Sequence, residues 1–175
     1  NKNIQSCNKE SDVFHLNKTY NKNEQRFGDK KALIIDYSMY SQNNLESIHS
    51  FRTGEKIYLD LSVKFFSKIE NLTLGIIFRT YNGSLIYSTN SIWNKKLQIP
   101  DVVEKDSSQI FNFCFDCLFL PGDYFISCGI SSKLRKENIS HDKRLNSIHL
   151  KVESDYKEQG LMDLNLNSIS RNQYK

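Results

Sequence analysis

The sequence lacks the signatures of most nucleotide-dependent, hydrolytic and membrane-spanning proteins. It has no GxxxxGK[ST] phosphate loop, no GxSxG element and no apolar run long enough to cross a bilayer. Its histidines have neither the HExxH spacing nor a strand-borne triplet suited to a metal; they are His15, His49, His141 and His149. Asp and Glu are common, but nothing singles out a catalytic pair. We therefore predict a protein that is not an enzyme and that holds no metal and no cofactor.

The net charge of +4 is unevenly distributed along the chain. Residues 32–132 hold eight Lys/Arg and ten Asp/Glu, so the excess positive charge lies at the two ends. A nucleic-acid-binding domain concentrates its basic residues on the folded surface that follows the phosphates. The slightly acidic middle and the absence of a nucleic-acid-binding motif argue against such a partner.

The four cysteines do not form a metal or disulfide motif. Cys114 and Cys117 make a CxxC, but it falls in a predicted strand, where residues three apart point to opposite faces. No second CxxC or histidine pair completes a zinc site. We interpret Cys7, Cys114, Cys117 and Cys128 as small buried hydrophobic residues in a reducing compartment.

Alternation of apolar and polar residues is the dominant pattern in the middle of the chain. It is clearest over Lys56–Phe66 and Ile110–Phe119, and it recurs over Leu72–Arg79. Aromatic residues make up 12% of the sequence, which favours strands because flat rings pack well on a pleated surface. Further strands are expected at Ala32–Met39, Leu85–Ser88, Tyr124–Ile130, Ser147–Glu153 and Leu161–Leu166.

Turn residues separate these predicted strands. Asn82-Gly83 is typical of a two-residue type I′ hairpin turn, and Pro121-Gly122 of a second turn. The one helix-like stretch, Ser132–Glu137, is too short to form a helix of any consequence. Seven or eight short strands, each with one solvated face, predict an all-β fold: an antiparallel β-sandwich of the immunoglobulin-like or jelly-roll type.

The two ends differ in composition from the middle of the chain. Residues 1–25 are polar and rich in Asn and Lys, and the apolar pair Val13-Phe14 has no periodic continuation. We therefore predict that residues 1–25 form a linker or tail that does not pack on the domain. The sandwich is expected over residues 26–170, and residues 171–175 are expected to form a C-terminal tail.

A set of short motifs, in a fixed order, is more specific than the composition. They are Arg26-Phe27-Gly28, Thr53-Gly54-Glu55, Leu74-Gly75-Ile76-Ile77-Phe78, Thr89-Asn90, Leu120-Pro121-Gly122-Asp123-Tyr124, His141-Asp142 and Gly160-Leu161-Met162-Asp163-Leu164. Over residues 26–167, this order and spacing resembles the C-terminal domain of Wzt, the ATP-binding subunit of bacterial ABC transporters that export O-antigen and related polysaccharides. Two positions depart from the family pattern. Ser88 stands where the family usually has Gly, and Lys143-Arg144 replaces an aromatic segment; both are expected in or near loops.

The resemblance implies a carbohydrate-binding domain that recognises an O-antigen-type polysaccharide before export. It further implies an N-terminal ATPase domain and a membrane-spanning transporter subunit as partners in the full-length protein. The chain would then be the excised sugar-binding part, located in the cytoplasm at the inner face of the cytoplasmic membrane. The family domain also pairs as a homodimer with C-terminal strand exchange, and Leu161–Leu166 would be the exchanged strand here.

Sugar chemistry selects the candidate site residues. Pyranose rings stack on Trp or Tyr, and their hydroxyls pair with planar groups such as those of Asp, Asn and Arg. The wet faces of two successive predicted strands, and the segment after the predicted hairpin, supply such groups. The candidates are Tyr58, Asp60, Arg79, Tyr87, Asn90 and Trp93. Each also has a purely structural interpretation: Trp93, for example, could fill the core under a long loop.

Two other functions stay open from the sequence alone. One is a protein-interaction sandwich that uses its basic ends or an open edge strand. The other is a jelly-roll enzyme that acts on sugars. The sequence names neither the sugar, its linkage nor a terminal modification, and it does not say which face of the sandwich holds the pocket.

Overall fold

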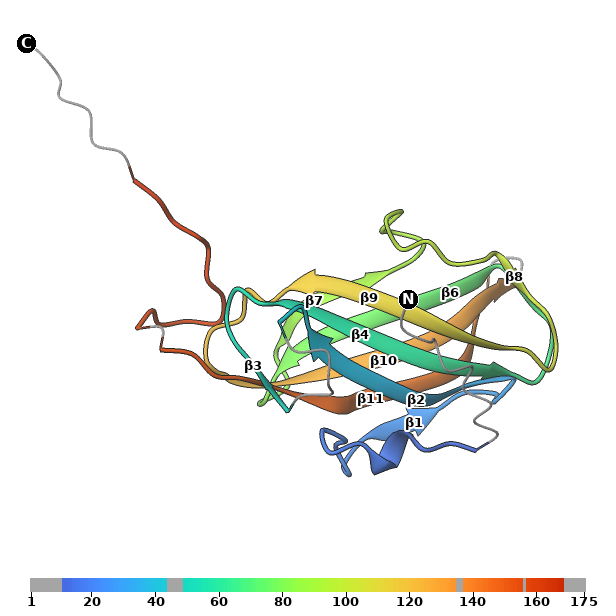
Figure 1. The fold of residues 1–175 in the computed structure, drawn as a ribbon. Coiled ribbons are helices and arrows are strands. Elements are labelled where there is room, and N and C mark those ends of the chain that lie inside the picture. Colours follow the sequence, from blue (N-terminus) through green and yellow to red (C-terminus); the bar gives the residue numbers. More distant parts are fainter. Residues whose placement is uncertain (1–10, 44–48, 135–136, 156, 169–175) are drawn as a thin grey trace, which may run out of the picture.

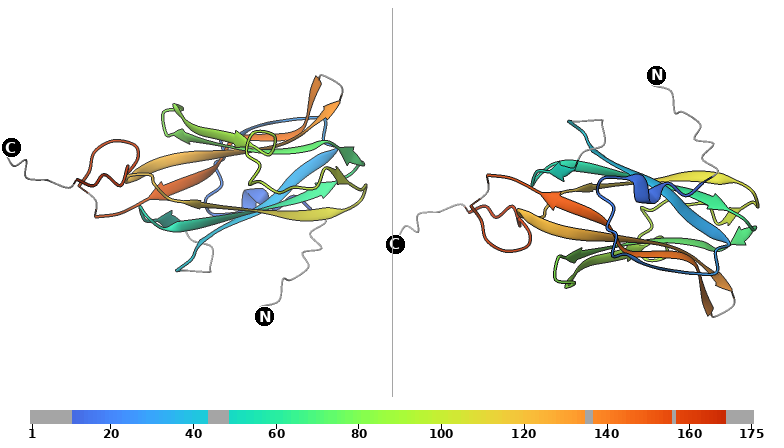
Figure 2. Two further views of the ribbon diagram at one scale, coloured as in Figure 1. Left: turned by 90° about the horizontal axis from the view of Figure 1, so that it is seen from above. Right: turned by 90° about the horizontal axis from the view of Figure 1, so that it is seen from below.

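The computed structural model describes residues 11–43, 49–134, 137–155 and 157–168. In these ranges the regular secondary structure is β-strand, apart from one short 3-10 helix, η1 (Phe14–Leu16). Two sheets, antiparallel except for one short parallel pair of strands, lie face to face with the core between them (Figure 2). The predicted all-β sandwich is confirmed. None of the described residues belongs to a helix long and apolar enough to span a membrane.

The larger layer is a six-stranded sheet in the order β1-β11-β10-β6-β7, with β3 pairing on β11 (Figure 1). Its strands are β1 (Gln25–Phe27), β3 (Ser50–Phe51), β6 (Leu72–Thr80), β7 (Leu85–Asn90), β10 (Gly122–Leu134) and β11 (Glu137–Val152). The second layer is a three-stranded sheet of β2 (Ala32–Ser41), β4 (Lys56–Phe65) and β9 (Ser108–Asp116). A two-stranded ribbon joins β5 (Ile69–Glu70) and β8 (Val102–Val103).

Strict alternation in the central strands builds the core. In β4 every second residue from Ile57 to Phe65 is fully buried, and the residues between them are partly exposed. The inward row of β6, which includes Leu74 and Ile76, packs between the layers, while the intervening residues face outward. Period-two alternation buries one face of each strand, so the apolar sides of the two sheets meet.

Strand β11 begins at Glu137, ten residues earlier than the predicted Ser147–Glu153. In the described part of the helix-like stretch, Ser132–Leu134 end β10 and Glu137 begins β11, and Ser132 pairs with Ile139. Two register shifts interrupt this hairpin, each placing extra residues on β11. Because such bulges break the period of two, the sequence pattern hides this part of the strand.

The prediction that residues 1–25 do not pack is wrong for the described part of that segment. Phe14 is completely buried, and its ring centroid lies 4.4 Å from that of Tyr37. The backbone N–H of Val13 donates to the carbonyl of Ile35 at 2.8 Å, and Tyr20 forms an isolated bridge with Ile148. This segment therefore covers the seam between β2 and β11.

Two smaller predictions also need correction. Gly83 has φ of +88°, but Asn82 does not have positive φ, and the Gly83 N–H donates to the carbonyl of Thr80. This is a three-residue hairpin loop and not a type I′ turn. At the other end, residues 161–166 form no strand within this chain: Met162 makes one bridge with Phe119, and the last described residues lead away from the sandwich (Figure 1). The predicted tail 171–175 lies outside the described residues.

Candidate functional site

A hollow lies on the outer face of the six-stranded sheet, the face turned away from the core. One row of paired residues crosses it from strand to strand, running through β1, β11, β10, β6 and β7. Its members are Phe27, Lys143, Gly129, Gly75 and Asn90. Cross-strand partners share a face, so all five project from the same side of the sheet.

The centre of this row is bare backbone. Gly75 and Gly129 are direct partners on the two middle strands, so two adjacent positions carry no side chain. The pocket above them has a volume of about 390 Å³. A glycine inside a strand often marks a place where a ligand approaches the backbone closely. The paired glycines therefore form the floor of a pocket that is a candidate binding site.

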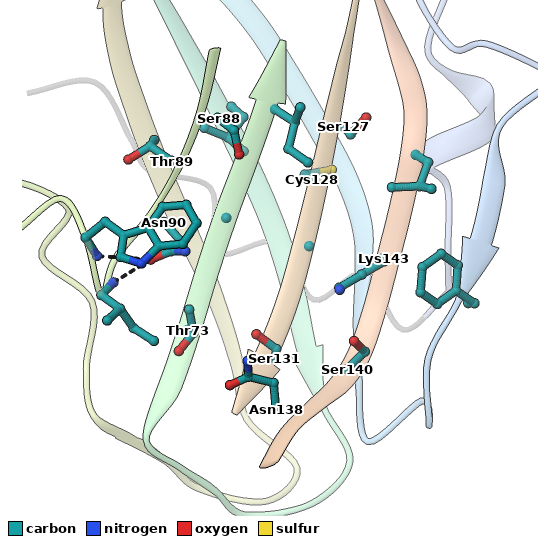
Figure 3. Close-up of a pocket in the computed structure, with 18 residues that line it drawn as sticks. Thr73, Ser88, Thr89, Asn90, Ser127, Cys128, Ser131, Asn138, Ser140 and Lys143 are labelled. Atoms are coloured by element: carbon teal, nitrogen blue, oxygen red, sulfur yellow. Dashed lines mark hydrogen bonds between the residues drawn. The ribbon is translucent and has the colours of Figure 1, made fainter. Parts of the chain in front are cut away.

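Small hydroxyl and amide side chains surround the glycine floor (Figure 3). Those that line the pocket are Thr73, Ser88, Thr89, Asn90, Ser127, Ser131, Asn138 and Ser140. Hydroxyls donate and accept, and amides do both through separate atoms. The lining therefore suits a ligand with many hydroxyl groups in varied directions.

Aromatic and apolar side chains form the two ends of the pocket. Trp93 is 72% exposed and stands at the β7 end. The side-chain oxygen of Asn90 accepts hydrogen bonds from the backbone N–H groups of Ile92 (2.9 Å) and Trp93 (3.0 Å), which fixes the turn that carries the indole. Phe27, which is 50% exposed, closes the opposite end. Exposed aromatic rings beside a polar floor are suited to stacking on sugar rings.

Lys143 supplies the positive charge of the pocket. It projects from β11 beside Gly129, and its amino group lies 5.8 Å from the centroid of the Phe27 ring. Among the described residues that line the pocket, none is Asp or Glu. The site is therefore neutral except for one cation.

Paired charges behind the pocket hold β1 and β11 in place. The Arg26 guanidinium donates to both carboxylate oxygens of Asp142 at 2.9 and 2.8 Å, and that of Arg144 to both oxygens of Glu24 at 3.0 and 2.7 Å. Asp142 and Arg144 are almost fully buried, and Asp12 bridges the two arginines. Two-pronged arginine–carboxylate pairs are geometrically specific, so they fix the strands that carry Phe27 and Lys143.

These contacts shift the acid–base behaviour of the paired groups. Burial alone would lower the pKa of the Arg26 guanidinium, but the hydrogen bonds that it donates to Asp142 and Asp12, together with the negative charges of these carboxylates, outweigh burial and raise it. Burial raises the pKa of Asp12, and the Arg26 hydrogen bond with the charges of Arg144 and Arg26 more than reverses this, leaving the pKa below its usual value. Both groups are charged at neutral pH.

A Ser-His-Asp chain lies elsewhere in the same sheet. Nε2 of His141 is 2.9 Å from the hydroxyl of Ser132, and its Nδ1 is 2.8 Å from Asp29. Ser132 is only 8% exposed, and the N–H of the next residue, Lys133, already donates to the carbonyl of Asn71. A reactive serine needs access and free N–H donors for an oxyanion. This set of hydrogen-bonded side chains therefore links the β1–β2 turn to β10 and offers no reactive nucleophile.

Metal ligation and thiol chemistry find no support in the residues described. No group of three or more His, Cys, Asp or Glu in these ranges is placed to hold a metal ion. Cys117 and Cys128 are buried as predicted, but Cys114 is exposed, and β9 ends at Asp116, so Cys117 lies just after the strand; all three are free thiols. Burial raises the pKa of Cys117 to about 11, which keeps that thiol protonated at neutral pH.

The structure separates the six predicted site residues. Asn90 and Trp93 line the pocket. Arg79 is on the same outer face, but it lies four residues along β6 from Gly75, a separation of about 13 Å along the strand. Its guanidinium donates to the carbonyl of Gly83 at 3.0 Å. Trp93 does not fill the core, because its side chain is mostly exposed.

The other three predicted site residues lie away from the pocket. Tyr87 pairs with the inward Phe78 at the sheet edge, and their ring centroids are 6.3 Å apart. Tyr58 and Asp60 lie on the outer face of the three-stranded sheet, where Tyr58 stacks on Tyr40 at 5.2 Å. β4 and β6 belong to different sheets, so Tyr58 and Asp60 do not share a face with Arg79.

Sequence reasoning missed the glycine floor and the lysine. Gly75 and Gly129 both interrupt otherwise strand-like runs, and this signal was available in the sequence. Lys143 was expected in or near a loop, but it lies in β11; Ser88, the last residue of the predicted strand Leu85–Ser88, lies in β7. The bulges of β11 hid the strand, so nothing in the sequence placed Lys143 beside Gly129.

A family model and a solved structure that are similar to this chain both point to the same family. The family model for the Wzt C-terminal domain matches residues 23–164, which include every residue that lines the pocket. A solved structure described as "Crystal structure of the C-terminal domain of wzt" is similar at a TM-score of 0.86 and 27% sequence identity, covering 92% of this chain and 96% of that chain. No curated protein matches the sequence.

Proposed function

The chain belongs to the Wzt C-terminal domain family, and from this membership we propose that it binds an O-antigen-type bacterial polysaccharide in the glycine-floored pocket. The observation that carries the proposal is the pocket itself. Paired glycines expose the backbone, hydroxyl and amide groups surround it, and the exposed Trp93 stands at its end. These are the elements that a pyranose ring requires.

The expected affinity is weak, on physical grounds. Stacking one sugar face on Trp93 removes roughly 60–100 Å² from water, which stabilises the complex by about 1.5–2.5 kcal/mol. Each net hydrogen bond adds about 1 kcal/mol, and the entropy of holding a flexible glycan offsets part of the sum. Dissociation constants on the order of micromolar to millimolar follow.

Within this proposal the domain is a recognition module and performs no chemistry. In the full-length protein it would act beside an N-terminal ATPase domain and a membrane-spanning transporter subunit, in the cytoplasm at the inner face of the membrane. We also propose a homodimer in which residues 161–166 exchange between two copies. Leu164 and Leu166 are 82% and 91% exposed in the single chain, so a second copy would give these apolar side chains a partner.

A pocket-filling substitution tests the proposal. A Cβ atom at Gly75 would meet the Thr89 carbonyl oxygen at 3.5 Å and Cβ of Asn90 at 3.6 Å, which are ordinary contacts. Gly75→Val should therefore fold while its methyl groups fill the pocket floor. In calorimetric titration with the surface polysaccharide of the source bacterium, wild type should bind and Gly75→Val should lose binding at least tenfold.

The matched control is Ser62→Val, a change at an outward position of β4 in the opposite sheet. It adds similar bulk to a strand without touching the pocket, so binding should be unchanged. Equal binding by all three proteins would remove the pocket as the site. No binding by any of them to the polysaccharide would count against the carbohydrate function itself.

A further inference from the structure

We propose that the glycan recognised here carries an anionic group, and that Lys143 binds that group. The inference rests on the proposed function, because it assigns the chemical class of the ligand in the same pocket. Three features of the described residues carry it: the charge of the lining, the position of the lysine, and the groups around its amino group.

The pocket lining carries charge of one sign only. Lys143 is the one charged side chain among the described lining residues. Some lysines outside the pocket have carboxylate partners: the amino group of Lys56 lies 2.7 Å from Asp116, and that of Lys68 lies 3.1 Å from Glu70. In the described part of the chain, Lys143 has the Phe27 ring beside it and no carboxylate. A cation in a hollow without a counter-charge attracts an anionic ligand.

The position of Lys143 depends on Gly129. A Cβ atom at position 129 would lie 3.2 Å from Cγ of Lys143, so any larger residue would displace the lysine side chain. With glycine there, the lysine extends over β10, and its amino group is directed toward the middle of the pocket (Figure 3). The sheet therefore holds the charge over the floor, on a residue that is partly exposed.

The groups that surround the lysine are suited to an anion. Ser131 and Ser140 are cross-strand partners beside it, and Thr73 pairs with Ser131 on the next strand. Hydroxyl groups and the Asn138 amide can donate to carboxylate or phosphate oxygens, and hydrogen bonds to an ionised acceptor are stronger than neutral ones. An uncharged sugar would leave the lysine without a partner.

Two kinds of glycan carry such a group: one with an acidic sugar and one with a phosphate ester. Both present oxygens with negative charge, so the pocket recognises the shared chemistry. Defined oligosaccharides separate the two sources. The probes are an oligosaccharide with a glucuronic acid residue, its neutral methyl ester, and the corresponding glucose 6-phosphate and glucose compounds.

The test compares wild type with Lys143→Gln on these four probes by calorimetric titration or a glycan array. Wild type should bind at least one charged probe about tenfold more tightly than its neutral partner. Lys143→Gln should bind the members of each pair equally, and Lys143→Arg should restore the preference. Lys133→Gln, which removes an exposed lysine of β10 outside this pocket, is the control and should behave as wild type.

The outcomes separate this inference from the function on which it rests. If Lys143→Gln keeps the full preference, or if wild type shows none, Lys143 does not select an anion and the inference is wrong. If Gly75→Val abolishes binding while wild type does not distinguish charged from neutral probes, the pocket binds sugar and only the anion assignment fails. If Gly75→Val binds as wild type does, the pocket itself is wrong.

Discussion

Substitution of Phe14 tests the packing of the N-terminal segment against the sandwich, which the sequence did not predict. Its side chain is fully buried between Tyr37 and Arg144, whose guanidinium lies 3.6 Å from the ring centroid. Truncating a buried Phe to Ala costs about 3–5 kcal/mol, and a buried cation–π contact contributes about 1–2 kcal/mol of that. We therefore expect Phe14→Ala to lower the free energy of unfolding by about 3–5 kcal/mol.

The assay is urea denaturation followed by fluorescence or circular dichroism. With a denaturant dependence of about 2 kcal/mol per molar, the midpoint should fall by about 2 M. Leu16→Ala is the matched control, since Leu16 lies in the same 3-10 turn but is 69% exposed, and it should change stability by less than about 0.5 kcal/mol. If Phe14→Ala does not fold, Phe14→Leu should still cost about 1 kcal/mol. A Phe14→Ala protein as stable as the Leu16→Ala control would refute the packing.

Three further results follow from the same structure. Gly28→Ala should destabilise the domain strongly, because Gly28 has φ of +149° and a Cβ atom there would lie 2.2 Å from a carbonyl oxygen of β11. Gly75→Ala should be tolerated, and thermal melts compare the stabilities of the two variants. The folded-state pKa of Asp12 is below the ordinary value of 3.8, so its contribution is complete at neutral pH and is lost as pH falls through the folded pKa. Asp12→Asn should accordingly flatten the acid limb of the stability curve below about pH 4. If residues 161–166 exchange between two copies, truncation after Ser154 should give an unstable or aggregating species in light scattering, and a clean, well-folded monomer from the truncated protein would contradict the exchange.

The central strands could be predicted because their pattern is purely local. In β4, β6 and β9 the apolar residues alternate with polar ones, so the burial of each side chain follows from its position within its own strand. The type of fold follows from such strands, and the family motifs pointed to the same architecture. The sequence did not predict which face of the sandwich holds the pocket, because Gly75 and Gly129 come together only through long-range strand pairing.

The N-terminal segment shows a different limit of local patterns. Phe14 has no periodic neighbours, yet it is buried because Arg144 and Tyr37 come to it from distant strands. In β11, Asp142 and Arg144 occupy inward positions that an apolar pattern would assign to hydrophobic residues. Their partners, Arg26 and Glu24, lie more than a hundred residues earlier, so the buried pairs are invisible to any short window of sequence.

Backbone amide chemical shifts measured during titration with the surface polysaccharide test the central claim most directly. If the glycan lies on the glycine floor, the largest shifts should come from Gly75, Gly129 and Ser131, with the indole N–H of Trp93 shifting as well. Amides on the opposite sheet, such as that of Asp60, should hardly move. Shifts concentrated around Asp60, with Gly75 and Gly129 unmoved at saturating polysaccharide, would contradict the account.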